Sequence, residues 1–177
     1  MKKVICIGGH AQNGKDTSAD FLKEKLENKG ERVLILHYAD YLKFICGKYF
    51  GYKGTKSEED RKILQEIGTN IVRERYPDFW VDIIKMFLDV FGVDYDYFLL
   101  SDFRFPNESQ ELRFNAFPVI TLQINRINFD NKLPEEQKKH SSETSLDDFD
   151  FDYVINVGEG LDLLEKEVEK FICYFNL

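Results

Sequence analysis

The stretch GGHAQNGKDTSADF, residues 8–21, carries the strongest structural signal in the chain. It follows the apolar run KVICI, residues 3–7, and leads into residues 15–28, whose apolar side chains recur at helical spacing. Within it, Gly9 to Lys15 match the pattern G-x-x-x-x-G-K. In such a loop the glycines let the backbone curl, so that amide N–H groups surround phosphates while the lysine neutralises them. The strand–loop–helix context therefore predicts a nucleotide-phosphate loop, the alternative being a purely structural glycine turn.

The residue after the loop lysine departs from the usual pattern. Asp16 stands where a Ser or Thr hydroxyl commonly meets a magnesium ion. A carboxylate is a stronger oxygen ligand for this hard cation, but it adds negative charge beside a triphosphate. Two interpretations remain open. Either Asp16 binds the metal directly or through water while Thr17 bonds a phosphate, or Asp16 is a first-turn acid that only favours the helix dipole.

The rest of the chain alternates apolar runs with helical patterns, which predicts an α/β fold: a five-stranded parallel sheet covered by helices on both faces. The five strands are expected at residues 3–7, 32–36, 97–101, 118–124 and 153–157. Further helices are expected at about 41–50, from Ser57 (capped in combination with Asp60) to Pro77, at 80–91, and from Gly160 onward.

The length of 177 residues suits one compact domain. We expect a core with a helical insertion at about 40–92. Residues 125–152 are polar and poor in strand signals, and such long connections are often functional lids or disordered. This segment follows a predicted strand, so we interpret it as a mobile lid.

The composition limits the partners. The net charge of −8 comes from the C-terminal region, because residues 143–177 carry 10 acidic and 2 basic side chains while residues 1–142 are balanced. Without a basic run the chain is a poor candidate for long nucleic acid, although a small anionic ligand is compatible with it.

The sequence has no 18-residue apolar run, and the Met-Lys-Lys start leads into only four apolar residues. We therefore expect a cytoplasmic protein with no membrane partner, either a monomer or a homodimer. The cysteines Cys6, Cys46 and Cys173 are odd in number and far apart, so we expect buried free thiols rather than a disulfide framework or a metal site.

Several motifs together resemble one known family. The motifs are GKDTSADF (14–21), YADYLK (38–43), LLSDFRFPNE (99–108), HSSETSLD (140–147) and YVINVGEGLDLL (153–164). They span nearly the whole chain in the expected order, and they make it resemble the bacteriophage-type deoxynucleoside monophosphate kinases, relatives of dephospho-CoA kinase among the P-loop small-molecule kinases. In that family an Asp after the loop lysine is the ordinary residue. The resemblance implies transfer of the γ-phosphoryl group of ATP, with Mg²⁺, to the 5′-phosphate of a (deoxy)nucleoside monophosphate.

The resemblance also implies that the helical insertion at about 40–92 binds the acceptor, and it implies roles for particular residues. Lys15 would bridge the transferred phosphate, Arg104 would grip the acceptor phosphate with its planar fork, and Arg126 would be a lid arginine over ATP. The catalytic candidates are Lys15, Asp16, Arg104 and Arg126, and the magnesium candidates are Asp16 and Asp102. The ATP-binding candidates are Gly9, Gln12, Asn13, Gly14, Lys15, Asp16, Thr17, Asn156 and Gly158. The substrate-binding candidates are Asp40, Lys43, Arg73, Trp80, Asp102 and Arg104.

Simpler interpretations remain beside these. Arg104 could pair with Glu108, and Pro106 could merely begin the next helix. Asp40 and Lys43 also suit a solvated helix end, Trp80 also suits core packing, and of Arg61, Arg73 and Arg75 only one, Arg73, is expected to matter. His140 and Glu143 have no assigned chemistry beyond ordering the far end of the lid. For the whole chain the alternatives are a kinase for another metabolite, such as dephospho-CoA, or a weakly active nucleotide-sensing module.

Overall fold

The sheet in the computed structural model has five parallel strands, as predicted, and their order is β2-β3-β1-β4-β5. The structure describes residues 3–55 and 57–177, so Met1 and Lys2 of the Met-Lys-Lys start lie outside the described residues. The strands are β1 (Lys3–Gly8), β2 (Val33–Leu36), β3 (Tyr97–Phe103), β4 (Val119–Arg126) and β5 (Tyr153–Val157). Because the strands are parallel, their carboxyl ends meet at one edge of the sheet, where open α/β folds bind ligands.

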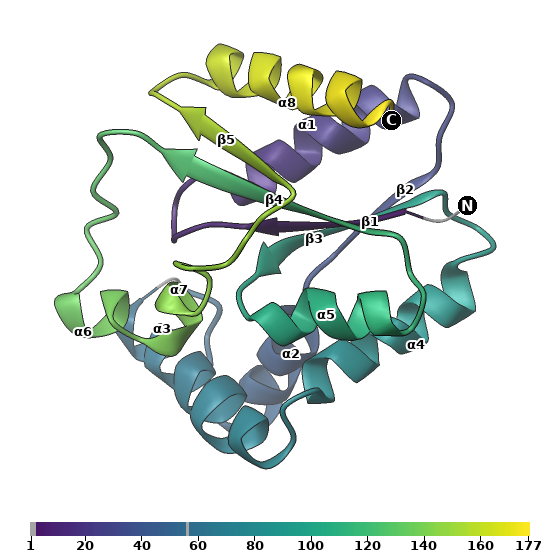
Figure 1. The fold of residues 1–177 in the computed structure, drawn as a ribbon. Helices are drawn as coiled ribbons and strands as arrows, with labels where there is room; N and C mark the ends of the chain where they lie inside the picture. The colour runs from purple at the N-terminus through teal and green to yellow at the C-terminus, as the bar shows by residue number, and fades with distance from the viewer. Residues whose placement is uncertain (1–2, 56) are drawn as a thin grey trace.

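Helices cover both faces of the sheet (Figure 1). Helices α1 and α8 pack on one face, and α2, α4 and α5 pack on the other (Figure 1). The bounds are α1 (Lys15–Glu27), α2 (Ala39–Tyr49), α3 (Glu58–Gln65), the π-helix η1 (Glu66–Arg73), α4 (Phe79–Phe91), α5 (Pro106–Phe114), α6 (Glu135–Lys138), α7 (Ser141–Thr144) and α8 (Leu161–Phe175).

The central strand β1 contributes side chains to two separate hydrophobic cores, one on each face of the sheet. Ile5 and Ile7 belong to the core with α1 and α8, whereas Val4 and Cys6 belong to the core with α2, α4 and α5. This alternation follows from the two-residue period of a strand. All four side chains are fully buried, which explains why the strand is apolar without interruption.

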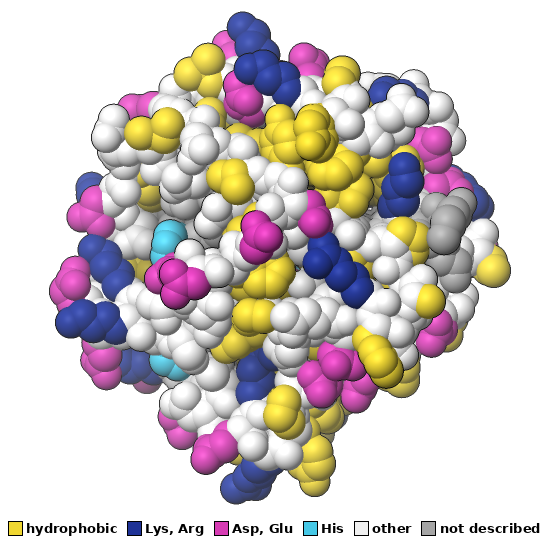
Figure 2. Space-filling model, viewed as in Figure 1, with side chains coloured by type: hydrophobic (Ala, Val, Ile, Leu, Met, Phe, Trp, Pro, Cys, Tyr) yellow, Lys and Arg dark blue, Asp and Glu magenta, His cyan; other side chains and the backbone are white. Residues whose placement is uncertain are grey.

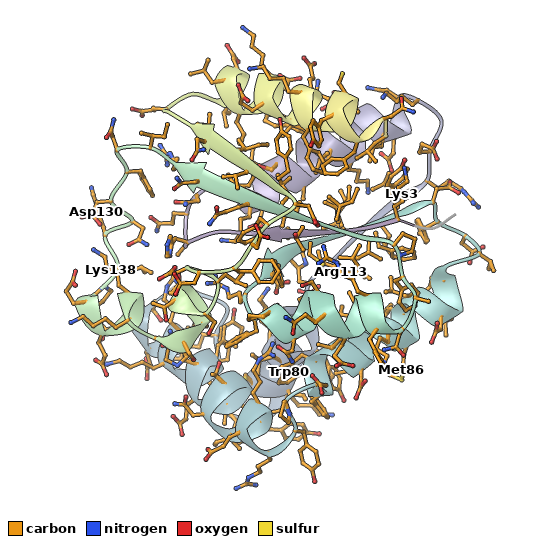
Figure 3. All side chains as sticks on the ribbon, in the orientation of Figure 1. Lys3, Trp80, Met86, Arg113, Asp130 and Lys138 are labelled. Atoms are coloured by element: carbon orange, nitrogen blue, oxygen red, sulfur yellow. The ribbon has the colours of Figure 1, made fainter. Side chains whose placement is uncertain are left out.

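The long helix expected between Ser57 and Pro77 changes its register midway. Ser57 caps α3 by accepting a hydrogen bond from the Asp60 backbone N–H, as predicted, but the helix then continues as the π-helix η1. The carbonyl of Gly68 in η1 accepts a hydrogen bond from Trp80 Nε1 at 3.0 Å. Trp80 is only 3% exposed and its side chain lies between the helices below the sheet (Figure 3), so core packing is its observed role. Such π-helical turns often occur at functional sites.

Two other expectations change. Cys6 and Cys46 are buried, but Cys173 is exposed, so the prediction of three buried thiols is wrong for that residue. The third and fourth strands also run further than expected, to Phe103 and Arg126, because backbone pairing with β1 and β5 continues past the apolar run.

Among the described residues, no helix is long and apolar enough to cross a membrane.

We predict that Gly9→Ala lowers the free energy of unfolding by about 2–4 kcal/mol. The backbone of Gly9 has a φ of 132°, and a Cβ atom there would lie 2.3 Å from the carbonyl oxygen of Ile124. Gly30→Ala is the matched control: its φ is also positive, at 88°, but nothing lies within 4 Å of the added atom, so a cost of about 1 kcal/mol is expected. Urea unfolding of both variants measures the difference, and equal costs would contradict the close approach.

Candidate functional site

The loop between β1 and α1 is held tightly against the end of β4. Asn13 Nδ2 donates a hydrogen bond to the Ile124 carbonyl at 3.2 Å, the same oxygen that the backbone of Gly9 passes closely. Gly14 adopts a φ of 93° and starts α1, whereas Gln12 takes a φ of 64° and is exposed. The turn therefore needs glycine at two of its positions, which matches the G-x-x-x-x-G-K pattern.

Lys15 folds back over this loop. Its Nζ atom donates hydrogen bonds to the carbonyl oxygens of Gly9 and His10, each at 2.8 Å, and the residue is 8% exposed. Burial, together with the nearby Arg104 guanidinium, lowers the pKa of Lys15 to about 8. The ammonium therefore lies inside the loop, where phosphate oxygens could replace the two carbonyls as its partners.

Asp16 presents an exposed carboxylate next to the end of β3. Its Oδ1 atom accepts a hydrogen bond from Ser101 Oγ at 2.7 Å and lies 3.9 Å from His37 Nε2. Thr17 beside it is half-buried. Within residues 3–55 and 57–177, no group of three or more His, Cys, Asp or Glu side chains could hold a metal ion. The site nevertheless fits magnesium, because that ion usually takes one or two carboxylates and completes its shell with water and substrate phosphates.

Asp102 anchors the N-terminus of α2. Its two carboxylate oxygens accept hydrogen bonds from the backbone N–H groups of Tyr38 and Ala39, both at 2.9 Å. A carboxylate is favourable at a helix N-terminus because of the helix dipole. These contacts fix the connection between β2 and α2 at the pocket edge, and the magnesium role of Asp102 stays a prediction.

Arg104 does not pair with Glu108 through its side chain, contrary to the simpler interpretation. Its Nη1 atom donates to the Ser142 carbonyl at 2.8 Å and forms an ion pair with Glu143 Oε1. The other oxygen of Glu143 accepts the Ala11 backbone N–H at 2.9 Å. Glu143, which lies 132 positions after Ala11 in the sequence, therefore links the phosphate loop to Arg104.

Glu108 holds a second arginine. Its Oε1 atom pairs with Arg73 Nη2, and its Oε2 atom accepts the backbone N–H groups of Arg104 and Phe105 at 2.7 and 3.2 Å. Burial raises the pKa of Glu108 to about 7, although Arg73 opposes this shift. Arg73 also stacks over the Phe105 ring at 4.0 Å. The prediction that Pro106 begins a helix is correct, and Glu108 anchors the turn before it.

A pocket of about 500 Å³ joins these groups. The phosphate loop and the end of β3 form one end, and α2, α3 and η1 form the other, with polar Gln65 and Thr69 beside apolar Leu42 and Leu64. The pocket brings together eight predicted site residues: Gln12, Lys15, Asp16, Lys43, Arg73, Trp80, Asp102 and Arg104.

The other predicted residues lie outside the lining of this pocket. Asp40 is exposed and pairs with His37 Nδ1 at 3.1 Å, which suits a solvated helix end. Asn156 is exposed and accepts a hydrogen bond from Asn125 at 2.8 Å, while Gly158 follows at the end of β5. Asn156 thus lies within β5 and Gly158 directly after it, and their role in adenine binding stays a prediction.

Arg126 lines a second pocket of about 290 Å³ on the other side of the loop, together with Asn13. Its guanidinium stacks over the Phe129 ring at 3.9 Å. Lys138 of α6 lies at the same pocket and pairs with Asp130 at 2.9 Å, where Figure 3 shows the two side chains near each other. The end of β4 and the helix α6 thus bring Arg126 and Lys138 to a pocket that loop residues also line.

Sequence reasoning missed three sets of contacts of this site. Glu143 lay in a motif that the sequence analysis singled out, but its partners Ala11 and Arg104 lie in the segments that follow β1 and β3, so no local spacing indicated them. Glu108 was considered as the partner of Arg104, whereas it pairs with Arg73. Ser101, which precedes Asp102, donates to Asp16, and only the parallel pairing of β1 and β3 brings the two together.

The described side chains show no continuous basic surface on the face drawn in Figure 2, where basic and acidic groups are interspersed. A phosphate-backbone footprint needs a basic patch or stripe.

One protein-family model and several solved structures are similar to this chain. A family model described as deoxynucleotide monophosphate kinase matches residues 48–168, a region that begins after the phosphate loop. No curated protein sequence matches the chain significantly. A solved structure of a sugar kinase from a Janibacter species has a TM-score of 0.56 at 14% identity and covers 99% of this chain and 95% of its own.

Two other solved structures are similar. An APS kinase from Mycobacterium tuberculosis in complex with AMPPNP and APS has a TM-score of 0.53 at 11% identity, covering 99% of this chain and 98% of its own. A shikimate kinase from Aquifex aeolicus has a TM-score of 0.51 at 13% identity, covering 98% of both chains. These likenesses show the P-loop kinase fold.

We predict that Lys15→Met changes how stability depends on pH. In the folded protein the lysine has a pKa of about 8, below its ordinary 10.5, so the folded state binds fewer protons between these values. The wild type should therefore gain stability relative to the variant as pH rises from 8 to 10.5, by about 3 kcal/mol in all. Denaturant unfolding across this range measures the difference, and parallel curves would show that Lys15 is not desolvated.

Proposed function

The chain belongs to the deoxynucleotide monophosphate kinase family, and we propose that it transfers the γ-phosphoryl group of ATP to the 5′-phosphate of a deoxynucleoside monophosphate. One observation carries this proposal beyond the family: a single pocket runs from the loop lysine, Lys15, to a partly apolar end beside Gln65 and Thr69. A nucleotide can lie along such a pocket with its phosphate at the loop end and its base at the other. Apolar walls with a few polar groups are typical of small-molecule sites.

Cationic groups along the pocket suit an acceptor phosphate. Lys43, Arg73 and Arg104 all border the pocket. Arg104 is the best placed, because one edge of its guanidinium is held by Glu143 and Ser142 while its side chain borders the pocket. A planar guanidinium binds phosphate oxygens through two parallel hydrogen bonds. The acceptor phosphate is ionised at neutral pH, so the transfer needs no general base and His140 needs no such role.

Positioning and charge neutralisation are the main requirements of phosphoryl transfer. In the proposed reaction an acceptor phosphate oxygen forms a bond to the γ-phosphorus of ATP, and the bond from that phosphorus to the bridging oxygen of ADP breaks. Lys15 would bind the transferred group in place of the Gly9 and His10 carbonyls. Asp16 would hold a magnesium ion, which supplies positive charge to the phosphate oxygens when bound.

Two segments, residues 40–92 and 125–152, would surround the bound nucleotides. The helices between residues 40 and 92 line the end that would receive the acceptor nucleoside. Residues 125–152 would cover ATP, with Arg126 as the phosphate contact and the turn at Asn156 and Gly158 near adenine. Arg126 lies at the second pocket, whose lining also includes loop residues His10 and Asn13.

A coupled assay of ADP release tests the function. With ATP and magnesium, we expect turnover of at least one member of the panel dAMP, dGMP, dCMP, dTMP and 5-hydroxymethyl-dCMP. Lys15→Met should lower this turnover by about 100-fold or more, because one preorganised electrostatic contact is commonly worth that much. The control is Lys23→Ala, which should be unchanged: Lys23 is a partly exposed lysine of α1 that pairs with Glu27 on the same helix.

If the protein phosphorylated dephospho-CoA and no deoxynucleoside monophosphate, it would be a kinase for a different metabolite. ATP binding without turnover of any acceptor, ribonucleotides included, would favour a nucleotide-sensing module.

We predict that Asp16→Ala raises the magnesium concentration needed for half-maximal rate. The carboxylate is exposed beside the loop and is the nearest acid to the lysine in sequence. Asp20→Ala, one turn further along α1, is the matched control and should keep the wild-type requirement. A titration of the initial rate with magnesium measures both. An unchanged requirement for Asp16→Ala would make this residue a helix-end acid only.

A further inference from the structure

Glu143 lies where the donor and acceptor phosphates of the proposed reaction would meet. It borders both the 500 Å³ pocket and the 290 Å³ pocket on the other side of the loop. We propose that Glu143 is a positioning residue that keeps the phosphate loop and Arg104 in fixed register, so that the two phosphates reach reacting distance. This inference rests on the proposed kinase function.

The two carboxylate oxygens of Glu143 have different partners. Oε2 accepts the Ala11 backbone N–H at 2.9 Å, and Oε1 pairs with Arg104 Nη1. The side chain is 6% exposed. Hydrogen bonds to an ionised group are stronger than neutral ones, and a buried carboxylate with two such partners is confined to one geometry. One side chain therefore connects the loop after β1 with the end of β3.

The contact leaves Arg104 able to bind a phosphate. Only its Nη1 atom is occupied, by Glu143 and by the Ser142 carbonyl at 2.8 Å. Within residues 3–55 and 57–177, Nη2 and Nε of Arg104 have no hydrogen-bond partner. A guanidinium carries five N–H donors in a fixed plane, so holding one edge orients the others. Glu143 thus orients the arginine and leaves its Nε and Nη2 donors available for a phosphate.

The short helix α7 directs Glu143 toward these partners. His140 precedes this helix, and its Nδ1 atom accepts the Ser142 backbone N–H at 3.2 Å and lies 2.9 Å from Ser142 Oγ. Burial lowers the pKa of His140, which favours the neutral ring that such an acceptor requires. The motif H-S-S-E (140–143) therefore has a physical purpose: His140 forms the turn, Ser142 supplies a carbonyl and Glu143 supplies the carboxylate.

A different role is compatible with the same contacts. A carboxylate on a loop N–H could simply fill the place of a phosphate oxygen in the empty protein and leave when ATP binds. The two roles predict opposite effects of removing the charge. Loss of an anion that competes with phosphate should tighten ATP binding, whereas loss of a positioning contact should slow transfer.

The test compares Glu143→Gln with Glu24→Gln in the ADP-release assay. Glutamine keeps the shape but loses the charge, and Glu24 is an exposed acid near the end of α1, away from the loop, that serves as control. We expect Glu143→Gln to lower kcat by roughly 10- to 100-fold, since small misplacement of reacting groups has effects of this size. KM for ATP and for the acceptor should change by less than about 3-fold. The control should match the wild type.

Two further variants separate positioning from folding. Glu143→Asp keeps the charge but is one methylene shorter, so it should retain more activity than Glu143→Gln. If Glu143 acts through Arg104, adding Glu143→Gln to Arg104→Ala should lower kcat by less than about 2-fold. Thermal unfolding verifies that each variant is folded.

Several outcomes would overturn the proposal. An active wild type with an equally active Glu143→Gln would reject the positioning role and leave the kinase function intact. A lower KM for ATP with undiminished kcat would identify a phosphate stand-in. Full additivity with Arg104→Ala would place the effect outside that arginine. A wild type that phosphorylates no monophosphate would reject the kinase function and this inference together.

Discussion

The close passage of the phosphate loop over the end of β4 is the constraint on which the rest of the site depends. The backbone at Gly9 lies so near the Ile124 carbonyl that a side chain has no room, and Asn13 binds the same carbonyl. This fixes where the loop's N–H groups and Lys15 lie relative to the sheet. The parallel strand order then places the carboxyl ends of β3 and β4 on either side of β1. Groups from both strands therefore reach the loop without any long connection.

The cationic side chains around the loop are held in fixed positions by specific partners. Lys15 lies inside it, and each of Arg73 and Arg104 is held by a buried or nearly buried glutamate. Arginines fixed in this way lose less conformational entropy when they bind a phosphate. The acids that hold them come from α5 and α7, so the binding geometry depends on segments remote from the loop in sequence. We regard this preorganisation as the physical basis of the proposed phosphoryl transfer.

Most of the fold could be predicted from the sequence, because apolar runs and helical spacing are local signals. The five strands, the loop and the helix cap at Ser57 are confirmed. The π-helical register of η1 was not foreseen, since it depends on packing of Gly68 against Leu42 and Trp80. The pairings of Glu143 and Glu108 were also missed. Both join residues from separate elements, and sequence spacing carries no information about such contacts. The roles of Asp102, Asn156 and Gly158 in ligand binding stay predictions.

The most direct test is a crystal structure with adenosine and a deoxynucleoside joined through five phosphates. The account predicts that the phosphate chain contacts Lys15 Nζ and the free edge of the Arg104 guanidinium. It also predicts that the deoxynucleoside lies in the 500 Å³ pocket beside Gln65 and Thr69. A structure in which the second nucleoside lies outside this pocket, with Arg104 away from the phosphates, would contradict the account.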